Sequence, residues 1–184
     1  LRRAEALVEA AAALRKIAGA ERVILALKAH YEPQAKALRA AIAAKGGPLS
    51  LCLLPPVYPV GDEQAVVHAA TGRIVPPGSL PGSVGCTVVS VSTALSAWDA
   101  LHGTPVTRRL FTVAGEVGRP GLYDAPVGTS VADVLGAAGG AKIKDVAILL
   151  GGPMMGELVK DPEGALVTKT CGGVLVLPSN HRLA

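Results

Sequence analysis

Residues 110–135, LFTVAGEVGRPGLYDAPVGTSVADVL, contain the pattern that predicts the architecture of the second half of the chain. An apolar run at 110–114 precedes a Gly/Pro-rich turn at 118–121, and a second run follows at 122–125. Two runs joined by such a turn predict a hairpin. Thr129 or Ser130 then serves as the N-cap of a helix. With a further strand at 146–150, the pattern indicates a small β-grasp sheet.

The first half of the chain alternates helical and strand-like patterns. Residues 1–18 and 33–45 have apolar positions at helical spacing, and short apolar runs follow at 23–27 and 49–54. This α-β-α-β order predicts a parallel sheet covered by helices. We therefore predict an α/β protein with two domains: a partial parallel-sheet domain over residues 1–106 and a β-grasp domain with the last strand over 107–184.

A Pro/Gly-rich segment, a short apolar run and a helical pattern lie between these two parts of the sequence. Residues 75–86 are rich in Pro and Gly, so no regular structure is expected there. The run VVSV at 88–91 is strand-like. Ser92 or Thr93 is then the expected N-cap of a helix that runs to Leu101.

Composition excludes several classes of protein. With 50% hydrophobic and 17% charged residues, the chain is not disordered. A net charge of +4 is too weak a field to favour a nucleic-acid partner. The sequence contains no uninterrupted window of about 18 apolar residues, so it predicts no membrane span. Three cysteines without a C-x-x-C pair indicate a reducing compartment, and they cannot supply the four thiolates of a usual iron–sulfur cluster.

Familiar catalytic motifs are missing from the sequence. It contains neither a Walker loop nor a G-x-G-x-x-G that opens a helix after a strand. No metal-ligand spacing joins the four histidines, which are His30, His68, His102 and His181. The sequence therefore assigns no catalytic residue and no metal site.

One acidic turn and one glycine-rich turn are candidate binding elements. Asp62 and Glu63 follow Gly61 at the start of a short helix. These carboxylates either interact with the helix dipole or accept hydrogen bonds from the ribose of a nucleotide. The sequence GGPMMG at 151–156 follows a strand directly, and its glycines permit either a tight turn or close approach of a ligand.

Several motifs, taken in order, resemble the RnfC/PduS family. They are YPVGDEQ at 58–64, TGRIVPPG at 71–78, GSVGC at 82–86, TVAGEV at 112–117, GGPMMG at 151–156, VTKT at 167–170 and GGVLVLP at 172–178. The tail is most similar to the branch that reduces cobalamin. More distantly, the chain is similar to the NADH-binding flavoprotein subunit of respiratory complex I.

The resemblance implies the central part of an NADH-dependent electron-transfer flavoprotein. A flavin- and NADH-binding α/β domain would be followed by a soluble-ligand-binding β-grasp (SLBB) domain. Electrons would pass from NADH through FMN and iron–sulfur clusters to a corrinoid, or to and from ferredoxin. The clusters, like the glycine-rich flavin loop, would lie outside these residues, so the 184 residues alone are expected to be inactive.

The same resemblance carries a nucleotide-site role onto Gly61, Asp62, Glu63 and Thr93. It carries no flavin contact onto His30 or Ser90, where relatives have other residues. Partner subunits of an electron-transfer or microcompartment complex are implied. The expected location is the cytoplasm, including a bacterial microcompartment lumen or the cytoplasmic face of a membrane complex. The alternative is a non-catalytic β-grasp module that binds a soluble ligand such as cobalamin or scaffolds a partner subunit.

Overall fold

The structure is a computed structural model that describes residues 3–153 and 155–183. The chain divides into two compact units, Leu1–Pro105 and Val106–Ala184. Within the described residues, none of the helices combines the length and apolar character needed to cross a membrane.

The first unit is an α/β layer structure built on two strands. Its elements are α1 (Ala4–Ile17), β1 (Val23–Lys28), α2 (Glu32–Lys45), β2 (Leu49–Leu54), α3 (Glu63–Thr71), the 3-10 turn η1 (Pro81–Val84) and α4 (Val91–Leu101). Strands β1 and β2 pair in parallel, with Val23 opposite Leu49 and Lys28 opposite Leu54.

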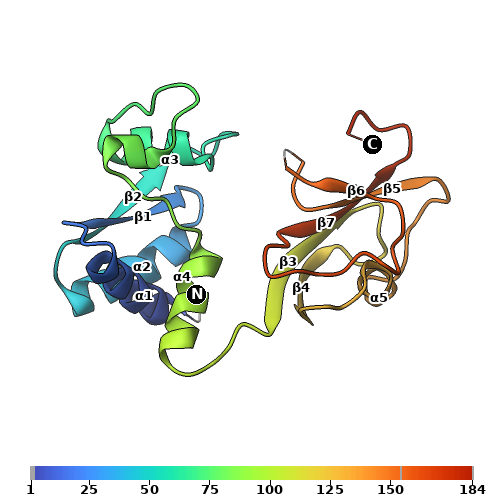
Figure 1. The fold of residues 1–184 in the computed structure, drawn as a ribbon, viewed down its shortest axis with the longest axis horizontal. Helices are drawn as coiled ribbons and strands as arrows, with labels where there is room; N and C mark the ends of the chain where they lie inside the picture. The colour runs from blue at the N-terminus through green and yellow to red at the C-terminus, as the bar shows by residue number, and fades with distance from the viewer. Residues whose placement is uncertain (1–2, 154, 184) are drawn as a thin grey trace. The chain divides into compact units, whose positions relative to one another are not determined.

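Helices cover both faces of this parallel pair. Leu25 and Leu51 face the apolar cluster formed by α1, α2 and α4. On the opposite face, the Cys52 thiol lies 3.9 Å from the carbonyl oxygen of Ala69 in α3. Figure 1 shows α1 and α2 on one side of the strands and α3 on the other. The predicted parallel-sheet α/β class is confirmed for this unit.

The second unit is a five-stranded sheet with one helix. Its elements are β3 (Arg108–Gly115), β4 (Gly121–Pro126), α5 (Val131–Ala137), β5 (Val146–Leu150), β6 (Glu157–Val159) and β7 (Gly173–Pro178). The strand order is β4-β3-β7-β5-β6. Strands β3 and β7 pair in parallel, whereas β3–β4, β5–β7 and β5–β6 are antiparallel. This is the predicted β-grasp arrangement, in which the last strand lies beside the first.

One face of the β-grasp sheet carries the core. Phe111, Val113 and Val174 are fully buried and pack in one cluster with Val131 and Val134 of α5. Ser130 is the N-cap of α5, because its hydroxyl accepts a hydrogen bond from the Asp133 amide at 3.0 Å. Strand β6 was not predicted, since three residues give too short a pattern to recognise.

The segment before α4 differs from the prediction. Residues 88–91 form no strand, although valine favours strands, because no neighbouring strand pairs with them. The N-cap of α4 is Ser90, not the predicted Ser92 or Thr93. The Ser90 hydroxyl accepts a hydrogen bond from the Thr93 amide at 3.1 Å. The expectation of no regular structure over 75–86 is also wrong at η1, which Pro81 begins.

Candidate functional site

The carboxyl ends of β1 and β2 define the candidate site. Parallel strands end at the same edge of a sheet, and ligands of α/β proteins bind outside that edge. Here Lys28 and Leu54 are paired at the ends of their strands. Residues 29–31 lead from this edge into α2, and residues 55–62 lead into α3. The acidic turn at Gly61 therefore lies on a connection that leaves the carboxyl edge.

Gly61 stands in open space. A Cβ added at Gly61 would meet no atom within 4 Å, and the backbone has no positive φ there. The protein's own packing thus gives no reason for a glycine at this position. Close approach of a ligand to the backbone would supply one.

Asp62 and Glu63 have different surroundings. Asp62 is the N-cap of α3, and its Oδ1 accepts a hydrogen bond from the Gln64 amide at 2.9 Å. One oxygen of this carboxylate is therefore engaged in holding the helix start. Glu63 is the first residue of α3 and is exposed to solvent. Its carboxylate is the better placed of the two to accept hydrogen bonds from a ligand.

Thr93 lies on the first turn of another helix, α4. Its hydroxyl is 2.9 Å from the Ser90 hydroxyl, and its amide donates to the same oxygen. Among the described residues, no hydrogen bond joins Thr93 to the turn at Gly61. Both features lie at exposed helix starts of the first unit, where backbone N–H groups favour an anionic or hydroxylated ligand.

An aromatic pair lies at the same carboxyl edge. The rings of His30 and Tyr31 have centroids 4.0 Å apart and are tilted by 48°. Both residues are exposed, and Tyr31 immediately precedes α2 without capping it through its side chain. The structure thus places His30 at the edge, although the family resemblance assigned it no contact.

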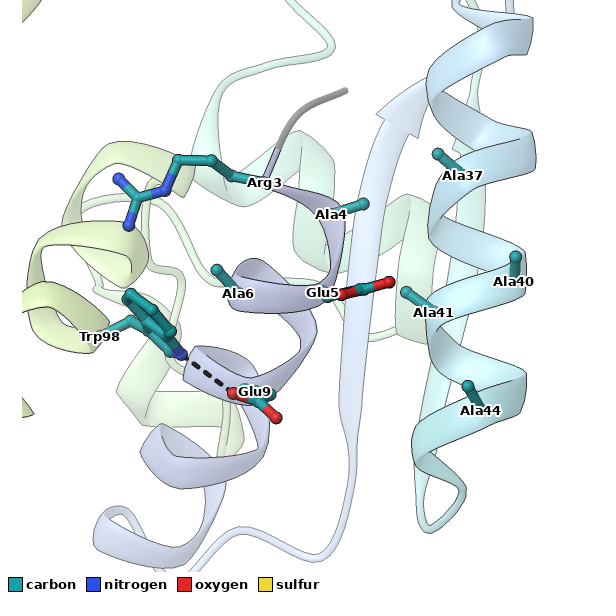
Figure 2. Close-up of a pocket in the computed structure, with 10 residues that line it drawn as sticks. All are labelled: Arg3, Ala4, Glu5, Ala6, Glu9, Ala37, Ala40, Ala41, Ala44 and Trp98. Carbon is teal, nitrogen blue, oxygen red and sulfur yellow. Dashed lines mark hydrogen bonds between the residues drawn. The ribbon is translucent and has the colours of Figure 1, made fainter. Parts of the chain in front are cut away.

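A groove lined mostly by alanines lies on the helical side of the first unit. It encloses about 720 Å³ between α1, α2 and α4. Trp98 Nε1 donates a hydrogen bond to Glu9 Oε2 at 3.1 Å (Figure 2). Arg3 pairs with Asp99, which is not one of the lining residues. None of Gly61, Asp62, Glu63 and Thr93 lines the groove. Because alanines supply no polar side-chain atoms and Trp98 and Glu9 are hydrogen-bonded to each other, the groove offers less binding chemistry than the carboxyl edge, despite its volume.

The thiols do not gather into a metal site. Among the described residues, no three His, Cys, Asp or Glu side chains are grouped closely enough to hold a metal ion. Cys52 and Cys86 are half-buried. Cys171 is buried, and desolvation raises the pKa of its thiol, with smaller lowering effects from the Gly173 backbone and the Arg109 guanidinium.

The glycine-rich turn at 151–156 packs against its own domain. A Cβ on Gly156 would lie 2.9 Å from Leu149 Cγ, and Gly151 has a φ of +114°. Met155 projects into solvent, while Met154 lies outside the described residues. Internal packing therefore accounts for these two glycines, as the tight-turn interpretation requires.

Arg73 lies beyond the end of α3 that is opposite the acidic turn, and the sequence assigned it no role. Its guanidinium donates to the carbonyl oxygens of Val84 and Gly85 at 2.7 and 3.4 Å. The one signal in the sequence is its position directly after the glycine that ends α3, within the TGRIVPPG motif. Nothing in that pattern indicates which carbonyl groups the side chain reaches.

Comparison with known proteins agrees with this architecture. The Nuo51 FMN-binding domain matches residues 1–99, and the SLBB domain matches residues 110–158. Cobalamin reductase PduS of Citrobacter freundii is 45% identical over 166 residues, which are 90% of this chain and 36% of that protein. A component of the proton-translocating ferredoxin:NAD(+) oxidoreductase complex of Clostridium ljungdahlii is 31% identical over 167 residues, again 90% of this chain and 36% of that protein.

A solved structure shows the same fold. The crystal structure of the air-oxidized NAD+-reducing [NiFe]-hydrogenase matches with a TM-score of 0.74 and 25% identity, over 98% of this chain and 37% of that one. The chain thus spans about a third of the length of the proteins it matches. The predicted resemblance to the RnfC/PduS group is confirmed, and the chain belongs to the Nuo51 FMN-binding domain family.

Proposed function

We propose that this chain is the central part of an NADH-dependent flavoprotein that passes electrons from NADH, through FMN and iron–sulfur clusters, to an acceptor. The main support is the match of its first unit to an FMN-binding domain, together with an open acidic turn at the carboxyl edge of the parallel strands. When bound, FMN supplies the conversion between two-electron hydride transfer and one-electron transfer.

The residues of the turn fit one part of a nucleotide. The exposed Glu63 carboxylate accepts hydrogen bonds, as the hydroxyl groups of a ribose or ribityl chain require. The open space at Gly61 admits a ligand to the backbone. The sequence has no Walker or G-x-G-x-x-G loop for the phosphate. We therefore assign Gly61, Asp62 and Glu63, with Thr93, to the sugar side of the nucleotide site.

The electron acceptor we propose is a corrinoid, with ferredoxin as the alternative. The higher identity to a cobalamin reductase, 45% against 31% for the component of the ferredoxin:NAD(+) oxidoreductase complex, supports the first. The clusters would be bound outside these residues, whose three cysteines are too few for one. Partner subunits and a cytoplasmic location, including a microcompartment lumen or the cytoplasmic face of a membrane complex, belong to the same proposal.

The test uses the full-length protein that contains these residues. We expect a flavin absorption band, extraction of FMN, and NADH oxidation that reduces cobalamin faster than ferredoxin. Glu63→Gln keeps the shape of the side chain and removes its charge, so nucleotide binding should weaken by about tenfold. Glu21→Gln, an exposed acid before β1 at the opposite edge, is the matched control. A protein without bound FMN or NADH oxidation would contradict the proposal.

A second candidate function is corrinoid binding by the β-grasp unit without catalysis. The outer face of its sheet, opposite α5, exposes Leu110, Leu122 and Leu158. An apolar face of this kind is typical of a ligand or partner surface. Titration of cobalamin into the complete protein without NADH should change its absorption spectrum, and Leu122→Asp should abolish that change. An unchanged spectrum in the unsubstituted protein would exclude this function.

A further inference from the structure

The connection from α3 to α4 contains a closed loop, residues 73–86. Its two ends meet because Arg73 Nη1 donates a hydrogen bond to the Val84 carbonyl oxygen at 2.7 Å. A longer contact of 3.4 Å reaches the Gly85 carbonyl oxygen. Compact loops with adjoining ends are frequently functional. The contact from Arg73 thus joins the two ends of this loop.

Arg73 is itself anchored at the end of α3. Its amide donates to the Thr71 hydroxyl oxygen at 3.1 Å, and that hydroxyl donates to the Val67 carbonyl oxygen at 2.7 Å. Gly72, with a φ of +73°, ends the helix between them. The guanidinium therefore extends from a fixed point on α3.

The same loop also contacts the start of α3. Gln64 Nε2 donates to the Ser79 carbonyl oxygen at 3.5 Å, while the Gln64 amide donates to Asp62 Oδ1 at 2.9 Å. Gln64 thus joins the loop to the acidic turn at Gly61–Glu63. Loop 73–86 is attached near both ends of α3, through Arg73 at one and through Ser79 at the other.

We propose that Arg73 is a positioning residue for nucleotide binding. By holding loop 73–86 closed, it keeps Ser79 against Gln64 and so fixes the turn that carries Glu63. This role rests on the proposed function of that turn. Arg73 touches carbonyl groups of the protein, so it acts through the loop and not on the nucleotide itself.

Removal of this contact leaves other anchors of the loop intact. Val75 and Pro81 are buried, so the loop stays attached when the guanidinium is absent. Arg73→Ala is therefore expected to fold. Arg73→Lys keeps a donor at nearly the same reach and provides the conservative rescue. Arg39→Ala, at an exposed position of α2, is the matched control.

The complete protein is assayed in three ways: FMN affinity by fluorescence titration, KM and kcat for NADH with excess FMN, and hydrogen exchange of the loop amides. Arg73→Ala should weaken nucleotide binding, seen in the FMN Kd or the NADH KM, by about tenfold, while kcat at saturation changes less than about twofold. The amides of Ser83, Gly85 and Cys86, which are hydrogen-bonded within the loop, should exchange faster. Arg73→Lys should recover part of each effect, and Arg39→Ala should show none.

The outcomes separate the two proposals. Unsubstituted protein that binds FMN and oxidises NADH, combined with unchanged binding in Arg73→Ala, overturns only the role of Arg73. A fall in kcat with unchanged KM and FMN affinity also overturns it, because positioning of the binding turn would not produce that pattern. Unsubstituted protein that binds neither nucleotide overturns the proposed function, and the role of Arg73 with it.

Discussion

Gly115 lies against the backbone of Val176 where β3 and β7 pair in parallel. A Cβ on Gly115 would come within 2.9 Å of the Val176 carbonyl carbon, and the φ of Gly115 is +92°. The Glu116 amide donates to the Val176 carbonyl oxygen at 2.8 Å immediately beyond this contact. The central pairing of the β-grasp sheet therefore requires a residue without a side chain at position 115.

Gly115→Ala should destabilise the β-grasp unit severely. The new methyl group would overlap the Val176 backbone, and the positive φ would be strained for alanine, so we expect a loss of about 2–4 kcal/mol in the free energy of unfolding. Gly121→Ala is the control, because a Cβ there meets no atom within 4 Å and the φ is not positive. Urea unfolding of both variants measures the difference. Equal stability of the two would contradict the close approach described above.

Adjacent residues of β3 should differ sharply in their contribution to stability despite their similar hydrophobicity. Phe111 is 1% exposed in the core beneath α5, whereas Leu110 is 55% exposed on the other face of the sheet. We expect Phe111→Ala to cost about 3–5 kcal/mol, and Leu110→Ala less than about 1 kcal/mol. Thermal unfolding followed by circular dichroism tests this. Similar losses at both positions would show that the outer face is covered as well.

Segments with a regular or continuous apolar pattern predicted their elements correctly. Features that depend on contacts with distant residues were not predicted. The apolar runs at 23–27 and 49–54 correspond to β1 and β2, because a strand covered by helices on both faces is continuously apolar. The valines before α4 predicted a strand wrongly, since strand propensity needs a partner strand and these residues have none. Ser90 became the N-cap instead.

At the candidate site, too, the features set by local sequence were predicted and those set by distant contacts were not. The helix start after Gly61 could be predicted from local chemistry, because Asp is a strong N-cap residue. The contact from Arg73 to Val84 joins residues eleven positions apart through a loop without periodicity. No local pattern specifies such a contact, so the sequence predicted a Pro/Gly-rich segment at 75–86 without the Arg73 contact that joins the ends of loop 73–86.

Substitutions at Asp62 should change stability, whereas substitutions at Glu63 should change nucleotide binding. Asp62→Ala removes the oxygen that accepts from the Gln64 amide, so the first unit should lose about 1 kcal/mol of stability. Asp62→Asn retains an amide oxygen at the cap and should be almost neutral. Glu63→Gln should leave urea unfolding unchanged while it weakens nucleotide binding. The interpretation of Asp62 as the N-cap fails if the alanine and asparagine variants are equally stable.

The buried thiol of Cys171 should make stability depend on alkaline pH. Burial raises the pKa of Cys171 above its ordinary value of 9.0, so the folded protein retains a thiol proton that the unfolded chain has already lost. The unfolded state then binds fewer protons, and the free energy of unfolding falls as pH rises above about 9. Below that pH both states are protonated and the contribution is fully present.

Because other groups also titrate in this range, the informative quantity is the difference in slope between the unsubstituted protein and Cys171→Ala, which has no thiol to lose a proton. The decline in stability between about pH 8 and 10 should be shallower in Cys171→Ala, and equal slopes would show that the thiol ionises as readily in the folded protein as in the unfolded chain.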